Sequence, residues 1–182
     1  AEVHKLKLKN LKSCLQMWTS VMSNGVEKNE WYRSFLNEQL SNPCVEFFKS
    51  ILGLQNKHTL PLISLVMTGL LKASNVEFHL SQAEQLQKEV DTILGDDGVI
   101  IFPSFPDDVP YHNQTLITNS FDFLYFAALN ILGCPVTQIP MGLNASGLPT
   151  GVQLMANRNN DHLTIRLAEH FESNFVGWIP PF

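Results

Sequence analysis

The chain has 182 residues, of which 45% are hydrophobic and 16% are charged, and its formal net charge is −5. This apolar content excludes an intrinsically disordered chain, and the length suits one domain with a buried core. The acidic balance argues against binding of nucleic acid, because surfaces that bind phosphates are usually basic. Three cysteines without CxxC spacing predict free thiols rather than a disulfide framework.

The first 44 residues predict a helical segment, with one helix in LKSCLQMWTSVM and a second in EKNEWYRSFLNEQL. Residues 45–78 then predict an apolar helical cap, in which Val45, Phe48, Ile51 and Leu52 recur at helical spacing. Its longest apolar run, LISLVMTGLL, has ten residues, whereas a helix that spans a bilayer needs about 20. From these residues alone, a core helix and a lipid-facing or acyl-lining helix both stay open.

Residues 79–182 predict alternating helices and strands. The stretch Ser81-Gln-Ala-Glu84 has the form of a capping box and predicts a helix start, and Gly95 predicts its end. The apolar stripe of this helix comprises Ala83, Leu86, Val90, Ile93 and Leu94. A turn at Asp96-Asp97-Gly98 leads into VIIF, a short apolar run typical of a strand buried on both faces. Helix, tight turn and buried strand together indicate an α/β fold.

A further helix is predicted from residue 119 to residue 132, with Gly133 as its end. Two strands follow, VTQI at 136–139 and GVQLMA at 151–156, joined by the turn GLNASGLP. A last helix is expected from Asn160 or Asp161, with its apolar residues turned inward; these are Leu163, Leu167 and Phe171.

Motifs for self-contained catalysis are missing from the sequence. Ser104, Asp107, Asp108 and His112 could be drawn as a triad, but no GxSxG turn is present to expose the serine. Neither HExxH nor CxxC…H spacing occurs, so we predict no metal, and no cofactor motif such as GxGxxG or a P-loop occurs.

Residues 98–174 resemble the carboxyl-terminal part of the amidase signature family. The matching stretches are GVIIFPSFP, then NILGCPVTQIPMGLNASGLPTGVQLMA, then NDHLTIRLAEHFE. With the apolar block ILGLQNKHTLPLISLVMTGLL upstream, the whole chain is similar to the fatty-acid amide hydrolases of animals. The resemblance implies that residues 1–182 are the carboxyl-terminal portion of an amidase α/β/α fold, in which helices cover a mixed central β-sheet.

Members of this family hydrolyse carboxamides with a serine nucleophile, a bridging serine and a lysine base. Their serines lie in a stretch rich in Gly-Gly and Ser-Ser pairs, and this sequence contains neither pair. The resemblance therefore implies no catalytic residue in this chain, which alone should be inactive. It also implies a partner, the missing amino-terminal half of the amidase.

The substrate expected from the resemblance is a fatty-acid amide, hydrolysed to a free fatty acid and an amine. Aligned on the family motif, Ser120, Phe123 and Ala127 would line the acyl channel from one side of a helix; core packing is the alternative for the last two. The apolar cap would contribute further lining residues, namely Phe48, Leu62, Leu65 and Val66. An intracellular enzyme in contact with a membrane surface is expected, and a homodimer stays open.

Two other interpretations remain. One is the amidotransferase component that processes mischarged transfer RNA, although a soluble component has no need of the apolar block at 45–71. The other is a truncated, non-catalytic module that binds a lipid or a protein partner. Separated from an amino-terminal half, the sheet would expose strand edges and an apolar face, so we expect the isolated chain to be poorly soluble or to associate.

Overall fold

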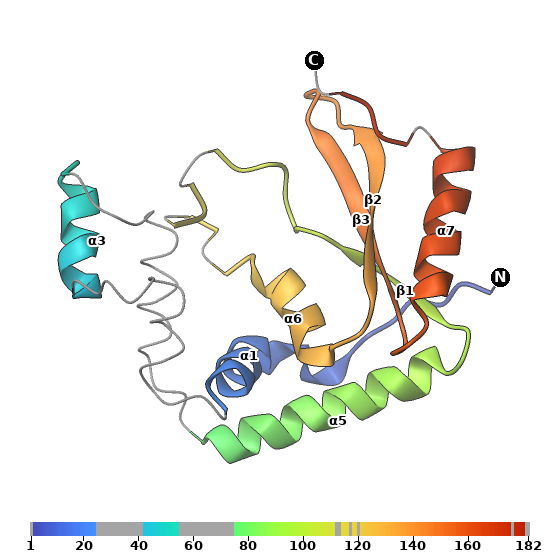
Figure 1. Ribbon diagram of the computed structural model, residues 1–182, viewed down its shortest axis with the longest axis horizontal. Coiled ribbons are helices and arrows are strands. Elements are labelled where there is room, and N and C mark those ends of the chain that lie inside the picture. Colours follow the sequence, from blue (N-terminus) through green and yellow to red (C-terminus); the bar gives the residue numbers. More distant parts are fainter. Residues whose placement is uncertain are drawn as a thin grey trace.

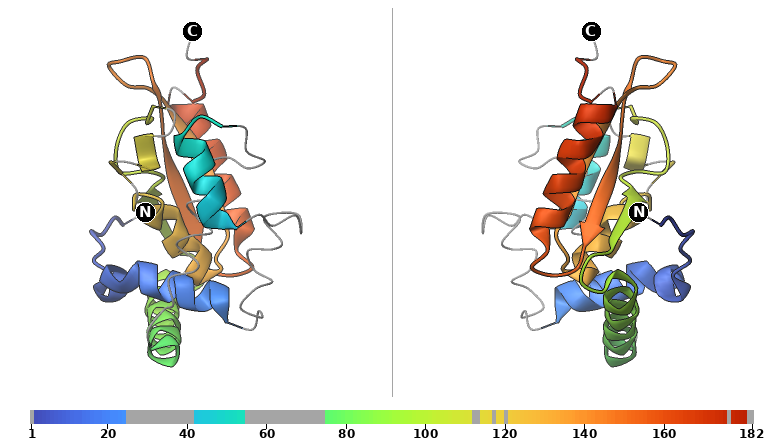
Figure 2. Two further views of the ribbon diagram at one scale, coloured as in Figure 1. Left: turned by 90° about the vertical axis from the view of Figure 1, so that its left-hand side faces the viewer. Right: turned by 90° about the vertical axis from the view of Figure 1, so that its right-hand side faces the viewer.

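The computed structural model describes residues 2–24, 42–54, 75–111, 114–116, 118–119, 121–175 and 177–180. Helices α1 and α6 lie on one side of a small β-sheet, helix α7 lies on the other, and α5 runs across below the end of the sheet (Figures 1 and 2). The elements in chain order are η1 (Lys9–Ser13), α1 (Cys14–Ser23), α3 (Pro43–Ile51), α5 (Val76–Leu94), β1 (Val99–Pro103), η2 (Gln114–Leu116), α6 (Leu124–Leu132), β2 (Val136–Leu143), β3 (Pro149–Ala156) and α7 (Asp161–Asn174).

The hydrophobic core lies where α1, α5 and α6 meet. Met17 of α1, Leu86 and Val90 of α5, and Leu132 of α6 are each at most 1% exposed. Ile100 and Phe102 of β1 and Met155 of β3 pack against this cluster, so one face of the sheet closes the core. The predicted stripe of α5 is confirmed at four positions, but Ile93 is 44% exposed and lies outside it.

Helix α5 begins at Val76, so the predicted start at Ser81 is wrong. Its N-cap is Asn75, in a left-handed conformation and without a side-chain capping hydrogen bond. Partly buried positions continue the helical period upstream of Ala83, including His79 and Leu80. Apolar periodicity therefore overrides the capping signal, and Ser81 becomes an exposed residue inside the helix.

Helix α6 begins at Leu124, five residues later than predicted. Before it, hydrogen bonds join residues three apart, from Asp122 N to Asn119 O and from Leu124 N to Phe121 O. The first bond that spans four residues runs from Ala127 N to Phe123 O, at 3.0 Å. A tighter turn thus precedes the α-helix. Gly133 ends the helix as predicted, in the left-handed conformation that glycine adopts without strain.

The sheet has the order β1-β3-β2, and both pairs of strands are antiparallel. Strand β2 continues past its predicted end through Pro140, with an irregular register between Pro140 and Leu143. Strand β1 is not buried on both faces as predicted, because Ile101 is 54% exposed beside the buried Leu154. The layered α/β architecture is as predicted, and the described strands contain no parallel pair.

Helix α7 covers the second face of the sheet over β2 and β3. Its buried Thr164 lies against β2, where Thr137 Oγ1 donates a hydrogen bond of 2.8 Å to Thr164 Oγ1. The turn before α7 is joined to the end of α5, because Arg158 Nη2 lies 2.5 Å from Asp91 Oδ2. The predicted helix is confirmed from Asp161, and its predicted inward residues are half-buried.

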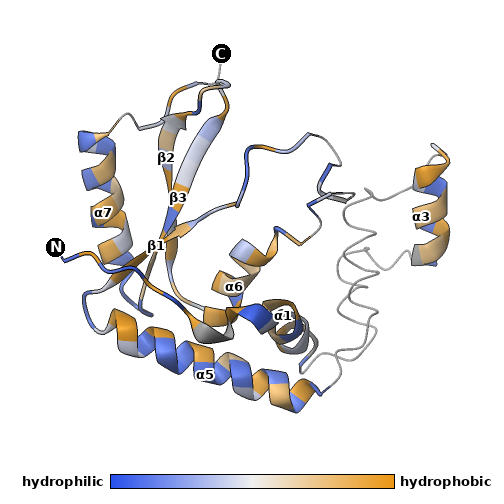
Figure 3. Cartoon of the chain, turned by 180° about the vertical axis from the view of Figure 1, so that it is seen from behind, coloured by the Kyte–Doolittle hydropathy of each residue, from blue (hydrophilic) through white to orange (hydrophobic). Residues whose placement is uncertain are grey.

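Helix α3 stands apart from the other described elements and is largely hydrophobic (Figures 1 and 3). Asn42 caps it by accepting a hydrogen bond of 3.0 Å from Cys44 N. Its buried charge, Glu46, is paired with Lys49 at 2.9 Å. Four of its apolar residues and flanking positions are 47–70% exposed; these are Val45, Phe48, Ile51 and Leu52. The second predicted helix of residues 1–44 and residues 55–74 of the cap lie outside the described residues.

Candidate functional site

The loop that follows β1, residues 104–110, is joined at both ends to the β2–β3 hairpin. At its start, Ser104 Oγ donates a hydrogen bond of 2.5 Å to Gln138 Oε1 on β2. Near its end, Asp108 Oδ1 accepts a bond of 2.7 Å from Asn144 Nδ2 in the hairpin turn. We call residues 104–110 the tethered loop.

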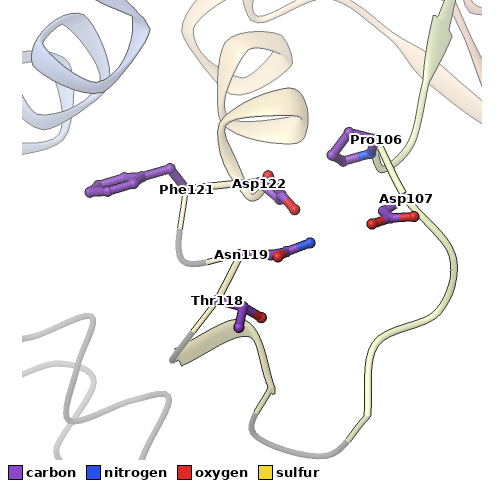
Figure 4. Close-up of a pocket in the computed structure, with 6 residues that line it drawn as sticks. All are labelled: Pro106, Asp107, Thr118, Asn119, Phe121 and Asp122. Atoms are coloured by element: carbon purple, nitrogen blue, oxygen red, sulfur yellow. The ribbon is translucent and has the colours of Figure 1, made fainter.

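The tethered loop borders a hollow of about 340 Å³, whose opposite wall is the segment before α6. Its lining residues are Pro106, Asp107, Thr118, Asn119, Phe121 and Asp122. In Figure 4, Asp107, Asn119 and Asp122 face the same space, whereas the ring of Phe121 extends to the other side. With two carboxylates and an amide from its two walls, the hollow offers hydrogen-bond acceptors to a ligand that carries N–H groups.

Two of the predicted substrate-binding residues pack inside the described part of the chain. Ala127 is 1% exposed and belongs to the core cluster. Phe123 precedes the first residue of α6, and its ring meets that of Trp18 edge-on with centroids 5.5 Å apart. Ser120 lies outside the described residues. A channel-lining role for these three residues stays a prediction.

The remaining predicted substrate-binding residues belong to the cap. Phe48 lies on α3 and is 63% exposed. Leu62, Leu65 and Val66 lie outside the described residues. Helix α3, which carries Phe48, lies apart from α6 (Figure 1), and an acyl-lining role for the cap stays a prediction.

Ser104 and Asp108, two residues of the possible triad, are each hydrogen-bonded to a residue outside it. Ser104 Oγ is bonded to Gln138 and Asp108 to Asn144, while His112 lies outside the described residues. The prediction of free thiols is confirmed for all three cysteines. Burial raises the pKa of the Cys14 thiol to about 11, and burial also raises the pKa of Cys134, although the nearby Arg158 charge opposes that rise.

Two glutamines on the sheet were missed by the sequence analysis. Gln138 and Gln153 are opposite each other in the β2–β3 register, so both side chains lie on one face. One signal in the sequence could have indicated this arrangement. Gly151 and Gln153 are two residues apart on a predicted strand, so they share a face of the sheet. The Gln138 side chain passes over Gly151, where no side chain obstructs it.

Within the described ranges, no group of three or more His, Cys, Asp or Glu side chains is placed to hold a metal ion. No helix among these residues has both the length and the apolar character needed to cross a membrane.

The geometry of the hollow and the sheet does not identify the family of this chain, but comparison with known families does. The family model described as Amidase matches residues 1–165. The chain belongs to the amidase family. The resemblance inferred from the proline and glycine motifs is therefore confirmed.

Within this family, the chain is similar to Fatty-acid amide hydrolase 2 of Homo sapiens, with 39% identity over 189 aligned positions. It is 37% identical to Fatty-acid amide hydrolase 2-A of Danio rerio over 187 positions. These alignments cover 100% and 99% of this chain, and 35% of each relative. The chain thus spans about a third of the length of the curated relatives it matches.

Among solved structures, the fold is similar to that of a glutamyl-tRNA(Gln) amidotransferase component from Thermotoga maritima. The TM-score is 0.64 at 16% identity, and the match covers 97% of this chain and 35% of that one. At this level of identity the likeness concerns the fold alone, and it confirms the predicted amidase architecture.

Proposed function

We propose that this chain is the carboxyl-terminal portion of a serine amidase that hydrolyses fatty-acid amides to a free fatty acid and an amine. The observation that carries the proposal is the 39% identity to Fatty-acid amide hydrolase 2, which extends over the whole chain. An alignment confined to the widespread turn motifs of the family would support only amide hydrolysis in general.

The exposed apolar side of α3 supports a lipid-related substrate. A contiguous exposed patch of large apolar side chains commonly marks a contact with a lipid, a ligand or a protein. We propose that this side, formed by Val45, Phe48, Ile51 and Leu52, contacts acyl chains at a membrane surface. Each methylene that leaves water gains about 0.8 kcal/mol, so such a surface favours long acyl chains.

The catalytic serines and lysine would come from the amino-terminal portion of the same amidase. Among the described residues, no further strand pairs with the outer edge of β1 or of β2, and Ile101 on β1 is 54% exposed; a sheet that continues in the amino-terminal portion would account for both. An open strand edge favours pairing with further structure. We also propose an intracellular, membrane-associated enzyme, for which no cofactor is required; a homodimer stays a prediction.

A fluorophosphonate probe tests which portion of the amidase carries the serine nucleophile. We would express the 182-residue chain alone and the longest product of its transcript, and treat both with the probe. We expect labelling of the longer product only, at a serine outside this chain. Labelling of the 182-residue chain alone, or a transcript that encodes no further amidase sequence, would overturn the proposal in favour of another serine site or of a non-catalytic module.

Substrate preference is tested with the labelled product. We expect hydrolysis of long-chain primary amides, with kcat/KM rising by up to about fourfold for each added methylene that the channel buries. Release of ammonia from glutamine without hydrolysis of fatty amides would instead identify an amidotransferase component. If kcat/KM did not change with acyl length, the proposal of an amidase would stand, but the proposed contact of α3 with acyl chains would be wrong.

A further inference from the structure

A polar side chain crosses the central strand of the sheet to hold the tethered loop. Gln138 lies on β2 and Ser104 follows β1, with β3 between them. Neighbouring strands are about 4.8 Å apart, so Gln138 must reach over a residue of β3. That residue is Gly151, where an added Cβ would overlap Gln138 Nε2.

The acceptor opposite Gln138 is left without a partner by this arrangement. Gln153 Oε1 is buried and accepts no hydrogen bond from any residue that the structure describes. A buried acceptor without a donor is unfavourable, and such groups are rare in folded proteins. The unsatisfied Gln153 Oε1 therefore needs a physical explanation, because the hydrogen-bonded amide of Gln138 lies directly opposite it.

The register places a suitable donor within reach of Gln153. Gln138 and Gln153 are directly opposite in the antiparallel pair, where Cβ atoms are about 5 Å apart. Rotation of the Gln138 side chain away from Gly151 would let its Nε2–H group donate to Gln153 Oε1. The same rotation would break the bond to Ser104, because one amide cannot occupy both places.

We propose that Gln138 is a two-position latch for the tethered loop. In the observed position it accepts from Ser104 and holds the loop, and Gln153 is unsatisfied. In the second position it satisfies Gln153 and releases Ser104 Oγ to water. Release breaks the solvent-accessible bond from Ser104 and the long bond of 3.4 Å from Gln138 Nε2 to Ile139 O, and in exchange satisfies the buried acceptor of Gln153. The latch requires the two positions to be close in free energy, which the exchange measurements below test.

The latch acts on one wall of the hollow. Pro106 and Asp107 of the tethered loop line it, while Asp108 keeps the far end of the loop bonded to Asn144. Release at Ser104 alone would therefore swing the loop about its far end and change the width of the hollow. Gln138 is thus a positioning residue. In the proposed amidase it would control access of the amide substrate, and only this last step rests on the proposed function.

Hydrogen exchange of residues 105–109 tests the latch without an activity assay. The measurements use the 182-residue chain, or the longer product if that is the soluble form. Loss of the closed state in Ser104→Ala should speed exchange of these amides by about tenfold. Loss of the competing acceptor in Gln153→Met should slow it by about threefold, because the open state is no longer favoured. The double variant should resemble Ser104→Ala.

The opposite signs separate a latch from a simple tether. A tether predicts faster exchange in Ser104→Ala and no slowing in Gln153→Met, and either unchanged or faster exchange in Gln153→Met would overturn the proposal. Exchange in α5 reports whether each variant is folded, and Ser173→Ala and Gln85→Met are the matched controls, which should leave residues 105–109 unchanged.

A measurement on the unmodified protein covers the case in which Gln153→Met does not fold. The side-chain amide protons of Gln138 should show NMR cross-relaxation with protons of both Ser104 and Gln153. Contacts with Ser104 alone would overturn the latch. Because neither experiment measures hydrolysis, loss of the proposed function would leave both results interpretable.

Discussion

Asn144 and Asp108 join the β2–β3 turn to the tethered loop through a hydrogen bond of 2.7 Å from Nδ2 to Oδ1. The same asparagine organises the turn, because its Oδ1 accepts from the backbone N–H groups of Ser146 and Leu148, each at 2.9 Å. One side chain therefore shapes the hairpin and anchors the loop beside it.

Replacement of Asn144 should destabilise the fold, because it removes the three side-chain hydrogen bonds described above. We expect Asn144→Ala to lower the free energy of unfolding by about 1–3 kcal/mol, measured by urea denaturation. Asn174→Ala, at the exposed end of α7, is the control and should change it by less than about 0.5 kcal/mol. Equal effects of the two substitutions would contradict the role of Asn144.

A carboxylate at position 144 would keep the two acceptor bonds but would face Asp108. Two neighbouring carboxylates disfavour the state in which both are ionised. We therefore expect Asn144→Asp to be less stable than the unmodified chain at pH 7. The difference should shrink as the pH falls and one carboxylate binds a proton. A difference independent of pH would exclude this repulsion.

Position 151 should tolerate only glycine. A Cβ there would overlap Gln138 Nε2 and would lie 2.7 Å from Ile139 O, a backbone atom that cannot move aside alone. We expect Gly151→Ala to lower the free energy of unfolding by about 1–3 kcal/mol. In the Gln138→Ala/Gly151→Ala double variant only part of the loss should be relieved, because the clash with Ile139 O remains. Full relief would assign the whole effect to Gln138.

The buried thiol of Cys14 makes stability depend on alkaline pH. Its pKa is raised by burial from 9.0 to about 11. Between these two pH values the folded chain therefore keeps a thiol proton that the unfolded chain has lost. This contribution is present below pH 9 and is lost as the pH rises to 11, by roughly 1–2 kcal/mol. In Cys14→Ala the fall in stability over this range should be smaller. Cys44→Ala, at an exposed thiol, is the matched control.

The exposed side of α3 should bind lipid without supporting the fold. We expect Phe48→Ser to change the free energy of unfolding by less than about 0.5 kcal/mol, because this side chain is 63% exposed. Co-sedimentation with phosphatidylcholine vesicles should fall several-fold. Phe78→Ser, at a phenylalanine that is 58% exposed on α5, is the matched control. Equal losses in both variants would show that α3 is not a preferred contact.

Most elements of the fold could be predicted from the sequence, because the glycines and prolines that end them agree with the spacing of the apolar residues. Gly133 and the turn 144–148 mark ends that the structure confirms. The errors lie at helix starts. Ser81 carries a valid capping pattern but lies inside a longer apolar period, whereas residues 121–123 continue the apolar pattern of α6 in a tighter turn. Local signals and helical period compete at such positions, and packing decides between them.

The candidate site was much less readable from the sequence. The bond between Ser104 and Gln138 joins residues 34 apart, and it requires the strand order β1-β3-β2, which no local pattern encodes. The unsatisfied Gln153 depends on the same register. Phe123 and Ala127 were placed by family resemblance, and the structure gives their packing within this chain rather than their contact with a substrate.

Three prolines, at positions 103, 106 and 110, restrict the tethered loop and its approach. Proline fixes one backbone dihedral and limits the residue before it, so a released loop has few conformations available. Little entropy is gained when the bond to Ser104 breaks, and little is lost when it forms again. Heating should therefore shift the balance between the two loop positions only weakly. The loop would move as a stiff arm over a wide range of temperature rather than melt.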